Sequence, residues 1–129
     1  MARELKAGHI GMMTNDMEGT VKWYEENLGF QKIGEFAAPD GAVIGFIQNN
    51  EIVYELIQPP VPVPEEACSK VDHYCYASDD IEEDYRDCVE KGCRFTTEGI
   101  MDAPFWEQGI RFFKIAGPSG EEVEFCQIL

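Results

Sequence analysis

The sequence is poor in basic residues and contains no long apolar run. Its 129 residues include 10 Lys and Arg against 25 Asp and Glu, a formal net charge of -15, which repels nucleic acid and anionic membranes. No segment approaches the roughly 20 apolar residues of a membrane span, and no apolar core of signal-peptide length follows Met1. We therefore expect a cytoplasmic protein that binds neither nucleic acid nor membrane.

The cysteines lack the spacing of a disulfide framework or a zinc finger. Their number is odd and no C-x-x-C occurs, so reduced thiols are expected. The five are Cys68, Cys75, Cys88, Cys93 and Cys126. At 44% hydrophobic, the chain is long enough to bury a core, and we expect one domain over residues 1–129.

The two halves of the chain repeat one pattern of polar residues. The sequence contains only two histidines, and one lies near the start of each half: His9 and His73. A Glu-x-x-Gln segment ends each half, as residues 55–58 and as residues 124–127. We place module one at about 5–58, a proline-rich linker at 59–70 and module two at about 71–129.

Each module is predicted to contain a strand, a helix and three further strands. The first strands are expected at 5–13 and 71–77. The later strands are expected at 30–38, 43–48 and 52–58, and at 93–97, 110–116 and 122–128. Three turn sequences, 39–41, 48–51 and 117–120, separate strands. The fold class is therefore α+β.

Both helices carry recognisable start and stop signals. Asn15 and Asp79 are each followed three positions later by Glu, the arrangement of an N-cap with a capping glutamate, and Gly29 and Gly92 stand at the expected C-terminal ends. Apolar residues at helical spacing predict the buried stripes. These are Met17, Val21, Tyr24 and Leu28 in the first helix, and Ile81, Tyr85, Cys88 and Val89 in the second.

The repeated His and Glu residues predict a metal site. Two imidazoles and two carboxylates, His9, Glu55, His73 and Glu124, form the ligand set of a divalent ion that keeps positions free for substrate. Glu55 shares its strand face with Val53 and Ile57, where an unpaired carboxylate would be costly. A small metalloenzyme is the leading hypothesis.

The chain resembles the vicinal-oxygen-chelate superfamily, which includes glyoxalase I, methylmalonyl-CoA epimerase, extradiol dioxygenases and bleomycin resistance proteins. The resemblance spans essentially the whole chain, and its clearest motifs are residues 23–30, WYEENLGF, and residues 117–125, GPSGEEVEF. It implies two tandem βαβββ modules forming a curled mixed sheet around a metal cleft, and a homodimer. The His-Glu-His-Glu order looks like the bacterial form of glyoxalase I.

The resemblance also implies a mechanism and a cofactor. A base removes a proton alpha to a carbonyl, and one divalent metal, Ni, Co, Zn or Mn, stabilises the enediolate. Glu124, or alternatively Glu55, would leave the metal to act as this base. Three readings stay open: a lactoylglutathione lyase-like lyase or isomerase, an epimerase of the methylmalonyl-CoA epimerase type, and a small-molecule-binding resistance protein without catalysis.

The small-molecule substrate is poorly defined by the sequence. Glutathione-dependent members have an arginine four residues after the first histidine, where this chain has Met13. Phe105 and Trp106 lie in a loop that suits either a lid over the site or a partner subunit. Arg111 and Lys114 follow this loop and are candidates for binding an anionic group of the substrate.

Overall fold

The computed structural model describes residues 4–68 and 70–129, so Ser69, in the predicted linker, lies outside the described residues. The described chain divides into two compact units: His9–Asp72, and His73–Leu129 together with residues 4–8. The first unit thus runs from His9 through the linker, and the second contains the rest of the chain together with the start of the first strand. Neither helix of the described chain is long and apolar enough to cross a membrane.

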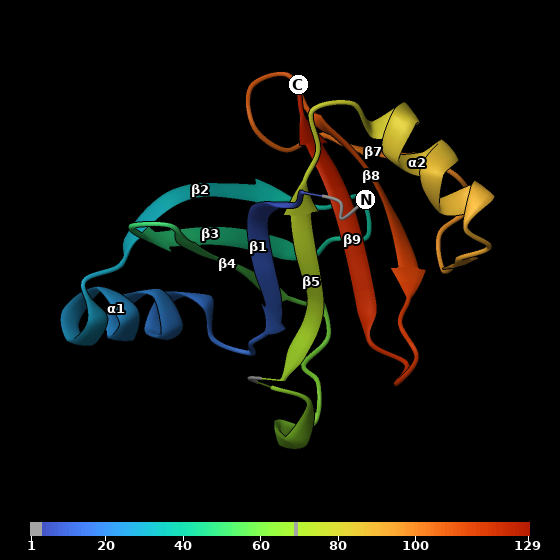
Figure 1. The fold of residues 1–129 in the computed structure, drawn as a ribbon. Helices are drawn as coiled ribbons and strands as arrows, with labels where there is room; N and C mark the ends of the chain where they lie inside the picture. The colour runs from blue at the N-terminus through green and yellow to red at the C-terminus, as the bar shows by residue number, and fades with distance from the viewer. Residues whose placement is uncertain (1–3, 69) are drawn as a thin grey trace. The chain divides into compact units, whose positions relative to one another are not determined.

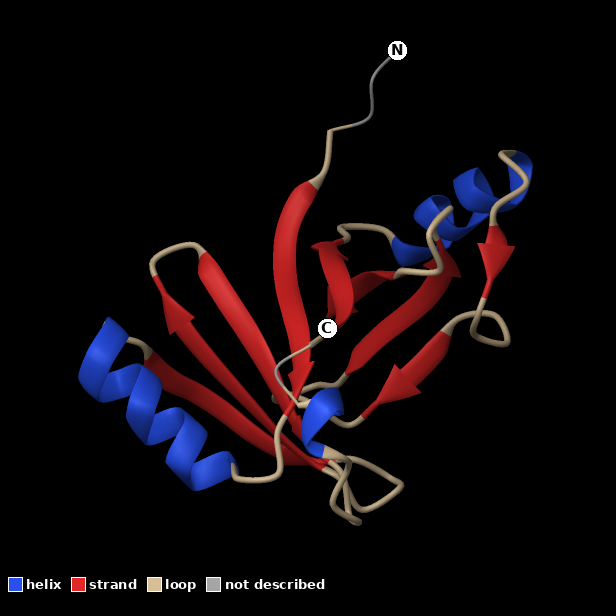
Figure 2. Ribbon diagram, turned by 90° about the horizontal axis from the view of Figure 1, so that it is seen from below, coloured by secondary structure: helices blue, strands red, loops and turns tan. Residues whose placement is uncertain are grey.

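The unit His9–Asp72 has the predicted βαβββ order. Its elements are β1 (Lys6–Met13), α1 (Met17–Leu28), β2 (Gln31–Ala37), β3 (Val43–Asn49) and β4 (Ile52–Gln58), and a 3-10 turn follows at Glu65–Ala67. The strands lie in the order β2-β3-β4-β1; β1 and β4 are parallel and the other pairs antiparallel. Figure 2 shows α1 running along these strands.

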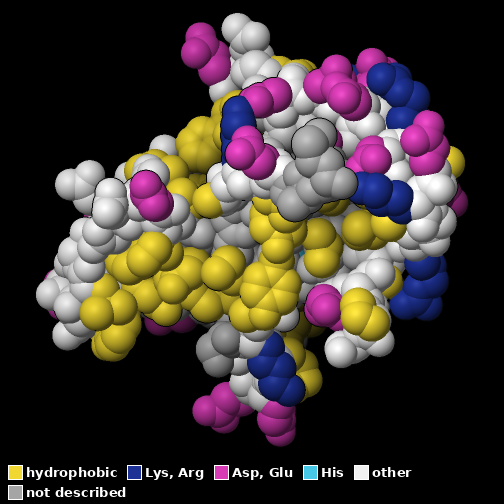
Figure 3. All heavy atoms as spheres, viewed as in Figure 1, with side chains coloured by type: hydrophobic (Ala, Val, Ile, Leu, Met, Phe, Trp, Pro, Cys, Tyr) yellow, Lys and Arg dark blue, Asp and Glu magenta, His cyan; other side chains and the backbone are white. Residues whose placement is uncertain are grey.

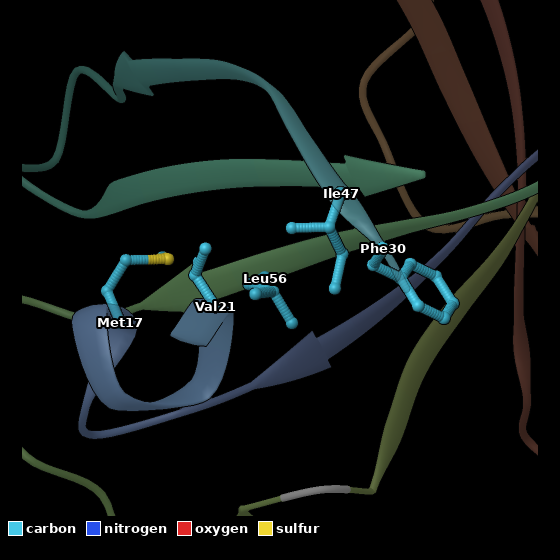
Figure 4. Packing of buried hydrophobic residues seen from close by; sticks show 5 residues of the cluster. All are labelled: Met17, Val21, Phe30, Ile47 and Leu56. Atoms are coloured by element: carbon cyan, nitrogen blue, oxygen red, sulfur yellow. The ribbon is translucent and has the colours of Figure 1, made fainter. Parts of the chain in front are cut away.

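The core of this unit lies between α1 and one face of its sheet (Figure 4). Met17 and Val21 point from the helix toward Ile47 and Leu56 on the strands, and both strand residues are fully buried. Leu28, which we predicted in the buried stripe, is exposed. It is the last residue of the helix, and Gly29, with a φ of 70°, then turns the chain toward β2. Trp23 is also exposed, and apolar side chains gather around α1 in Figure 3.

The unit that contains His73–Leu129 has one strand more than predicted. Its elements are β5 (Val71–Ala77), α2 (Ile81–Glu90), β6 (Arg94–Phe95), β7 (Met101–Ala103), β8 (Ile110–Ala116) and β9 (Glu122–Ile128). The order is β5-β9-β8-β6, and β7 also pairs with β8. β5 and β9 are parallel, whereas β8 is antiparallel to β9. Figure 1 shows α2 beside β8 and β7.

Two predictions about these later strands were wrong. The strand predicted at 93–97 is only two residues long, because the hydroxyl of Thr97 accepts the backbone N–H of Lys114 and replaces the next ladder hydrogen bond. The loop predicted between Gly99 and Gly109 contains β7, which pairs with β8 through Ala103 and Ile110.

The core of this unit lies between α2 and the face of β8 and β9 that carries Phe113 and Phe125, whose rings stack with centroids 5.2 Å apart. Ile81 and Cys88 pack against them from α2. Val89 of the predicted stripe is exposed, because the buried face of this ten-residue helix is narrow and the opposite face is acidic (Figure 3).

Candidate metal ligands and their surroundings

His9 and Glu55 lie together in the first module. The parallel register of β1 and β4 pairs Glu55 with Gly11, two residues after His9, so the imidazole and the carboxylate share one sheet face. His9 Nε2 lies 3.4 Å from Glu55 Oε1, and the two side chains are 10% and 9% exposed. Phe46 presents its ring at right angles to His9, with centroids 5.4 Å apart.

His73 and Glu124 repeat this arrangement in the second module. Glu124 pairs in parallel register with Cys75, two residues after His73. His73 Nε2 lies 2.9 Å from Glu124 Oε1, and both side chains are almost fully buried, at 3% and 6% exposed. The same register therefore produces a buried His–Glu pair in each module.

The chemistry of the two pairs suits a divalent transition ion. Burying a carboxylate is unfavourable unless a proton, a cation or hydrogen bonds compensate for the lost hydration. Imidazole nitrogens and carboxylate oxygens are the donors that nickel, cobalt, zinc and manganese accept in proteins. The residues present thus fit the metal that the sequence pattern predicts, and each module supplies one nitrogen and one oxygen donor.

Sequence reasoning named Lys114 as a candidate for binding an anionic group, but it did not predict which residues face each carboxylate across the sheet. Phe46 is the antiparallel register partner of Glu55, and Lys114 is that of Glu124. Cys75 is buried, and its Sγ lies within 4.8 Å of a Glu124 carboxylate oxygen. Strand alternation could have identified Lys114 from the sequence, because successive residues of a strand point to opposite faces. Lys114 and Glu124 each lie next to a core residue, Phe113 and Phe125, and therefore share the opposite face.

Each glutamine of the repeated Glu-x-x-Gln segment holds the start of a helix. Gln58 Oε1 accepts the backbone N–H of Met17 at 2.7 Å, and Gln127 Oε1 accepts that of Ile81 at 3.0 Å. The repeat therefore combines a site carboxylate with a glutamine, three residues later, that satisfies one of the N–H groups left unpaired at a helix start.

The N-cap of each helix lies one residue later in the chain than predicted. Asp16 and Asp80 are the N-caps and accept from the backbone N–H groups of Gly19 and Glu83. Asn15 instead exchanges two hydrogen bonds with the backbone of Val63 in the linker.

The predicted substrate residues occupy different surroundings. Phe105 is buried, and Trp106, with a φ of 62°, lines a cavity of about 540 Å³. Among the described residues, the lining of this cavity includes neither His73 nor Glu124. Arg111 lies on the sheet face opposite to Glu124 and pairs with Asp102 at 3.7 Å. Met13 lines another cavity, with Lys70.

Comparison with known proteins assigns the chain to a family. The family model described as Glyoxalase/Bleomycin resistance protein/Dioxygenase superfamily matches residues 6–125. The uncharacterised protein YwbC of Bacillus subtilis (strain 168) is 33% identical over 124 residues, which cover 92% of this chain and 94% of YwbC.

Two solved structures with low sequence identity share the fold. The hypothetical protein BH1468 from Bacillus halodurans C-125 superposes with a TM-score of 0.83 at 19% identity, over 98% of this chain and 96% of that one. A methylmalonyl-CoA epimerase in complex with methylmalonyl-CoA and NH4+ superposes with a TM-score of 0.76 at 18% identity, over 95% and 94% of the two chains. With its two His–Glu pairs and βαβββ first module, the chain belongs to the Glyoxalase/Bleomycin resistance protein/Dioxygenase superfamily.

Proposed function

We propose that the protein is a metal-dependent lyase or isomerase that moves a proton alpha to a carbonyl group. The observation that carries this proposal is the duplicated, buried His–Glu pair, at 3.4 Å in one module and 2.9 Å in the other. We propose that His9, Glu55, His73 and Glu124 together hold one divalent ion. Such an ion acts as a Lewis acid that polarises the substrate carbonyl.

The two carboxylates are the proposed proton carriers. Glu124 leaves the ion when substrate binds and then accepts the proton from the carbon beside the carbonyl, and the electrons of that C–H bond move toward the carbonyl oxygen. Glu55, which must enter this step protonated, returns its own proton to carbon, and the two carboxyl groups exchange protons with solvent before the next turnover. The side chains of His73 and Glu124 are almost fully buried, which excludes water that would compete for the proton.

An epimerase is the second candidate function. Met13 stands where glutathione-dependent members have an arginine, which weakens the case for a glutathione substrate. The epimerase with the related fold binds methylmalonyl-CoA, and an epimerase uses the same two proton transfers, on opposite sides of one carbon.

We also propose a homodimer in the cytoplasm. Trp23 and Leu28 on α1 are about half exposed, and large apolar side chains of this kind are enriched at subunit interfaces. No disulfide joins the five cysteines, all of which lie in the described part of the chain, and a reducing compartment is compatible with this. A monomeric mass at micromolar concentration in light scattering would contradict the dimer.

Metal analysis tests the site. We expect about one equivalent of transition metal per chain after reconstitution with nickel, cobalt, zinc or manganese, and a loss of most of it in His73→Ala. A second pair of variants tests the carboxylate: Glu124→Gln and its matched control, Glu122→Gln. Glu122 lies two residues from Glu124 on the same strand and is far more exposed. Absence of metal from the wild-type protein with all four ions would refute the metal site.

Turnover then separates the functions. The glutathione hemithioacetal of methylglyoxal tests the lyase, and methylmalonyl-CoA tests the epimerase. We expect Glu124→Gln to lower kcat by about a hundredfold or more with metal still bound, and Glu122→Gln to change it little. Full turnover by metal-loaded Glu124→Gln would remove Glu124 from the proton transfer.

A further inference from the structure

Lys114 lies on the sheet face that carries Glu124. The two residues are direct partners in the antiparallel register of β8 and β9, and direct partners in such a ladder point to the same face. The opposite face, with Phe113 and Phe125, packs against α2. Lys114 therefore projects beside a proposed metal ligand, away from the core.

The backbone of Lys114 is held on both sides. Its N–H donates to Thr97 Oγ1 at 3.0 Å, and its carbonyl accepts the N–H of Thr96 at 2.9 Å. The side chain is only 22% exposed, so much of its flexible stem is covered. A lysine held in this way loses less conformational entropy when its ammonium binds a ligand.

The ammonium of Lys114 retains donors for a ligand. It forms an ion pair with the carboxylate of Glu122, whose oxygen lies 3.6 Å from the Lys114 nitrogen, a distance longer than that of a hydrogen bond. An ammonium has three N–H donors. Lys114 is thus a partly covered cation beside the proposed centre.

The internal repeat shows that the fold does not require a lysine here. The equivalent position of the first module, opposite Glu55, is occupied by Phe46, which is buried. If a cation were needed only to offset the buried glutamate, Glu55 would need one as well. The two modules have the same register but opposite chemistry at this position, which is the behaviour of a residue that determines specificity.

A second cation lies on the same face. Arg94 on β6 pairs with Ala116, two residues after Lys114 on β8, and is exposed. Arg111, in contrast, faces the α2 side and pairs with Asp102. The cationic side chains that share a face with Glu124 in this sheet therefore include Lys114 and Arg94, in a protein whose net charge is -15.

We propose that Lys114, supported by Arg94, binds an oxyanion of the substrate, a carboxylate or a phosphate, beside the carbonyl group on which the protein acts. This inference rests on the proposed function, because it specifies the substrate of that same site. It identifies the substrate class as carbonyl compounds that carry an anionic group, although the overall charge of the protein disfavours anions.

Three hydroxamates, which chelate metals alike but differ in charge, test the inference on nickel-loaded protein. Acetohydroxamate has no additional anion, malonomonohydroxamate adds a carboxylate, and phosphonoacetohydroxamate adds a phosphonate. Their dissociation constants are measured by calorimetry for wild type, Lys114→Met and Lys114→Arg. Lys91→Met is the matched control: it removes the same charge from an exposed lysine at the C-terminal cap of α2, which pairs with Asp87. Metal content and thermal unfolding are measured for every variant.

We expect Lys114→Met to weaken one or both anionic hydroxamates by about tenfold or more, and acetohydroxamate by less than about twofold. Lys114→Arg should restore much of the affinity, and Lys91→Met should affect all three probes equally and weakly. The anionic probe that loses more affinity identifies carboxylate or phosphate as the natural group. Equal losses for all three probes in metal-loaded Lys114→Met would overturn this inference alone, whereas absence of metal from the wild type would overturn it together with the proposed function.

Discussion

Gly8 and Gly45 form a matched pair of close contacts from which a difference in stability can be predicted. A Cβ atom added at Gly8 would lie 2.6 Å from the backbone carbonyl oxygen of Cys75, and one added at Gly45 would lie 2.6 Å from the sulfur of Met17. The distances are equal, but the obstacles differ. A sheet backbone cannot move without disturbing its ladder, whereas a thioether side chain can adopt another rotamer.

The expected magnitude for Gly8→Ala follows from this contact. The backbones at Gly8 and Cys75 must move apart by about half an ångström, and overpacking of this kind lowers the free energy of unfolding by about 1–3 kcal/mol. Replacing a strand glycine by alanine recovers about 0.5–1 kcal/mol of backbone entropy. The net loss lies between about 0 and 2.5 kcal/mol and is centred near 1 kcal/mol, which lowers the Tm by roughly 4 °C for a chain of this size. Gly45→Ala recovers the same entropy and should change the unfolding free energy by less than about 1 kcal/mol.

Urea unfolding followed by circular dichroism measures both variants, with thermal melts as a second measurement. Because Gly8 immediately precedes His9, metal affinity should also fall in Gly8→Ala and stay unchanged in Gly45→Ala. A Gly8→Ala protein as stable as Gly45→Ala would show that the Cys75 backbone yields easily and that the reasoning from close contact is wrong.

Two further predictions concern stability. Burial, with a smaller contribution from the nearby Tyr54, raises the pKa of Tyr24 above its ordinary value of 10.0. The unfolded chain therefore releases this proton at lower pH than the folded chain, and the free energy of unfolding falls as pH rises above about 10. Tyr24→Phe should flatten this fall in unfolding measurements made across pH, and an unchanged slope would contradict the prediction. Gln127→Ala removes the acceptor for the Ile81 N–H and should lower the free energy of unfolding by about 1 kcal/mol. Urea unfolding should show a lower midpoint with an unchanged m-value. An unchanged midpoint would show that water replaces the amide.

The sequence alone predicted most of the secondary structure. Four strands, 52–58, 71–77, 110–116 and 122–128, have the predicted bounds, because their β-branched and aromatic residues lie between clear turn signals. It could not choose between adjacent capping residues. Asn15 and Asp16 are both good N-caps, and the hydroxyl of Thr14, which accepts the N–H of Asp16 at 3.0 Å, favours the second.

The pairing of each histidine with its glutamate was also predictable, because duplication at equivalent strand positions reports a shared register. Tertiary structure alone decided which side chains stand opposite the glutamates. The partners Phe46 and Lys114 come from other strands, and a one-residue change in register would move them to the opposite face. The types of donor are local properties of the sequence, whereas the chemistry that surrounds them depends on how distant strands pair.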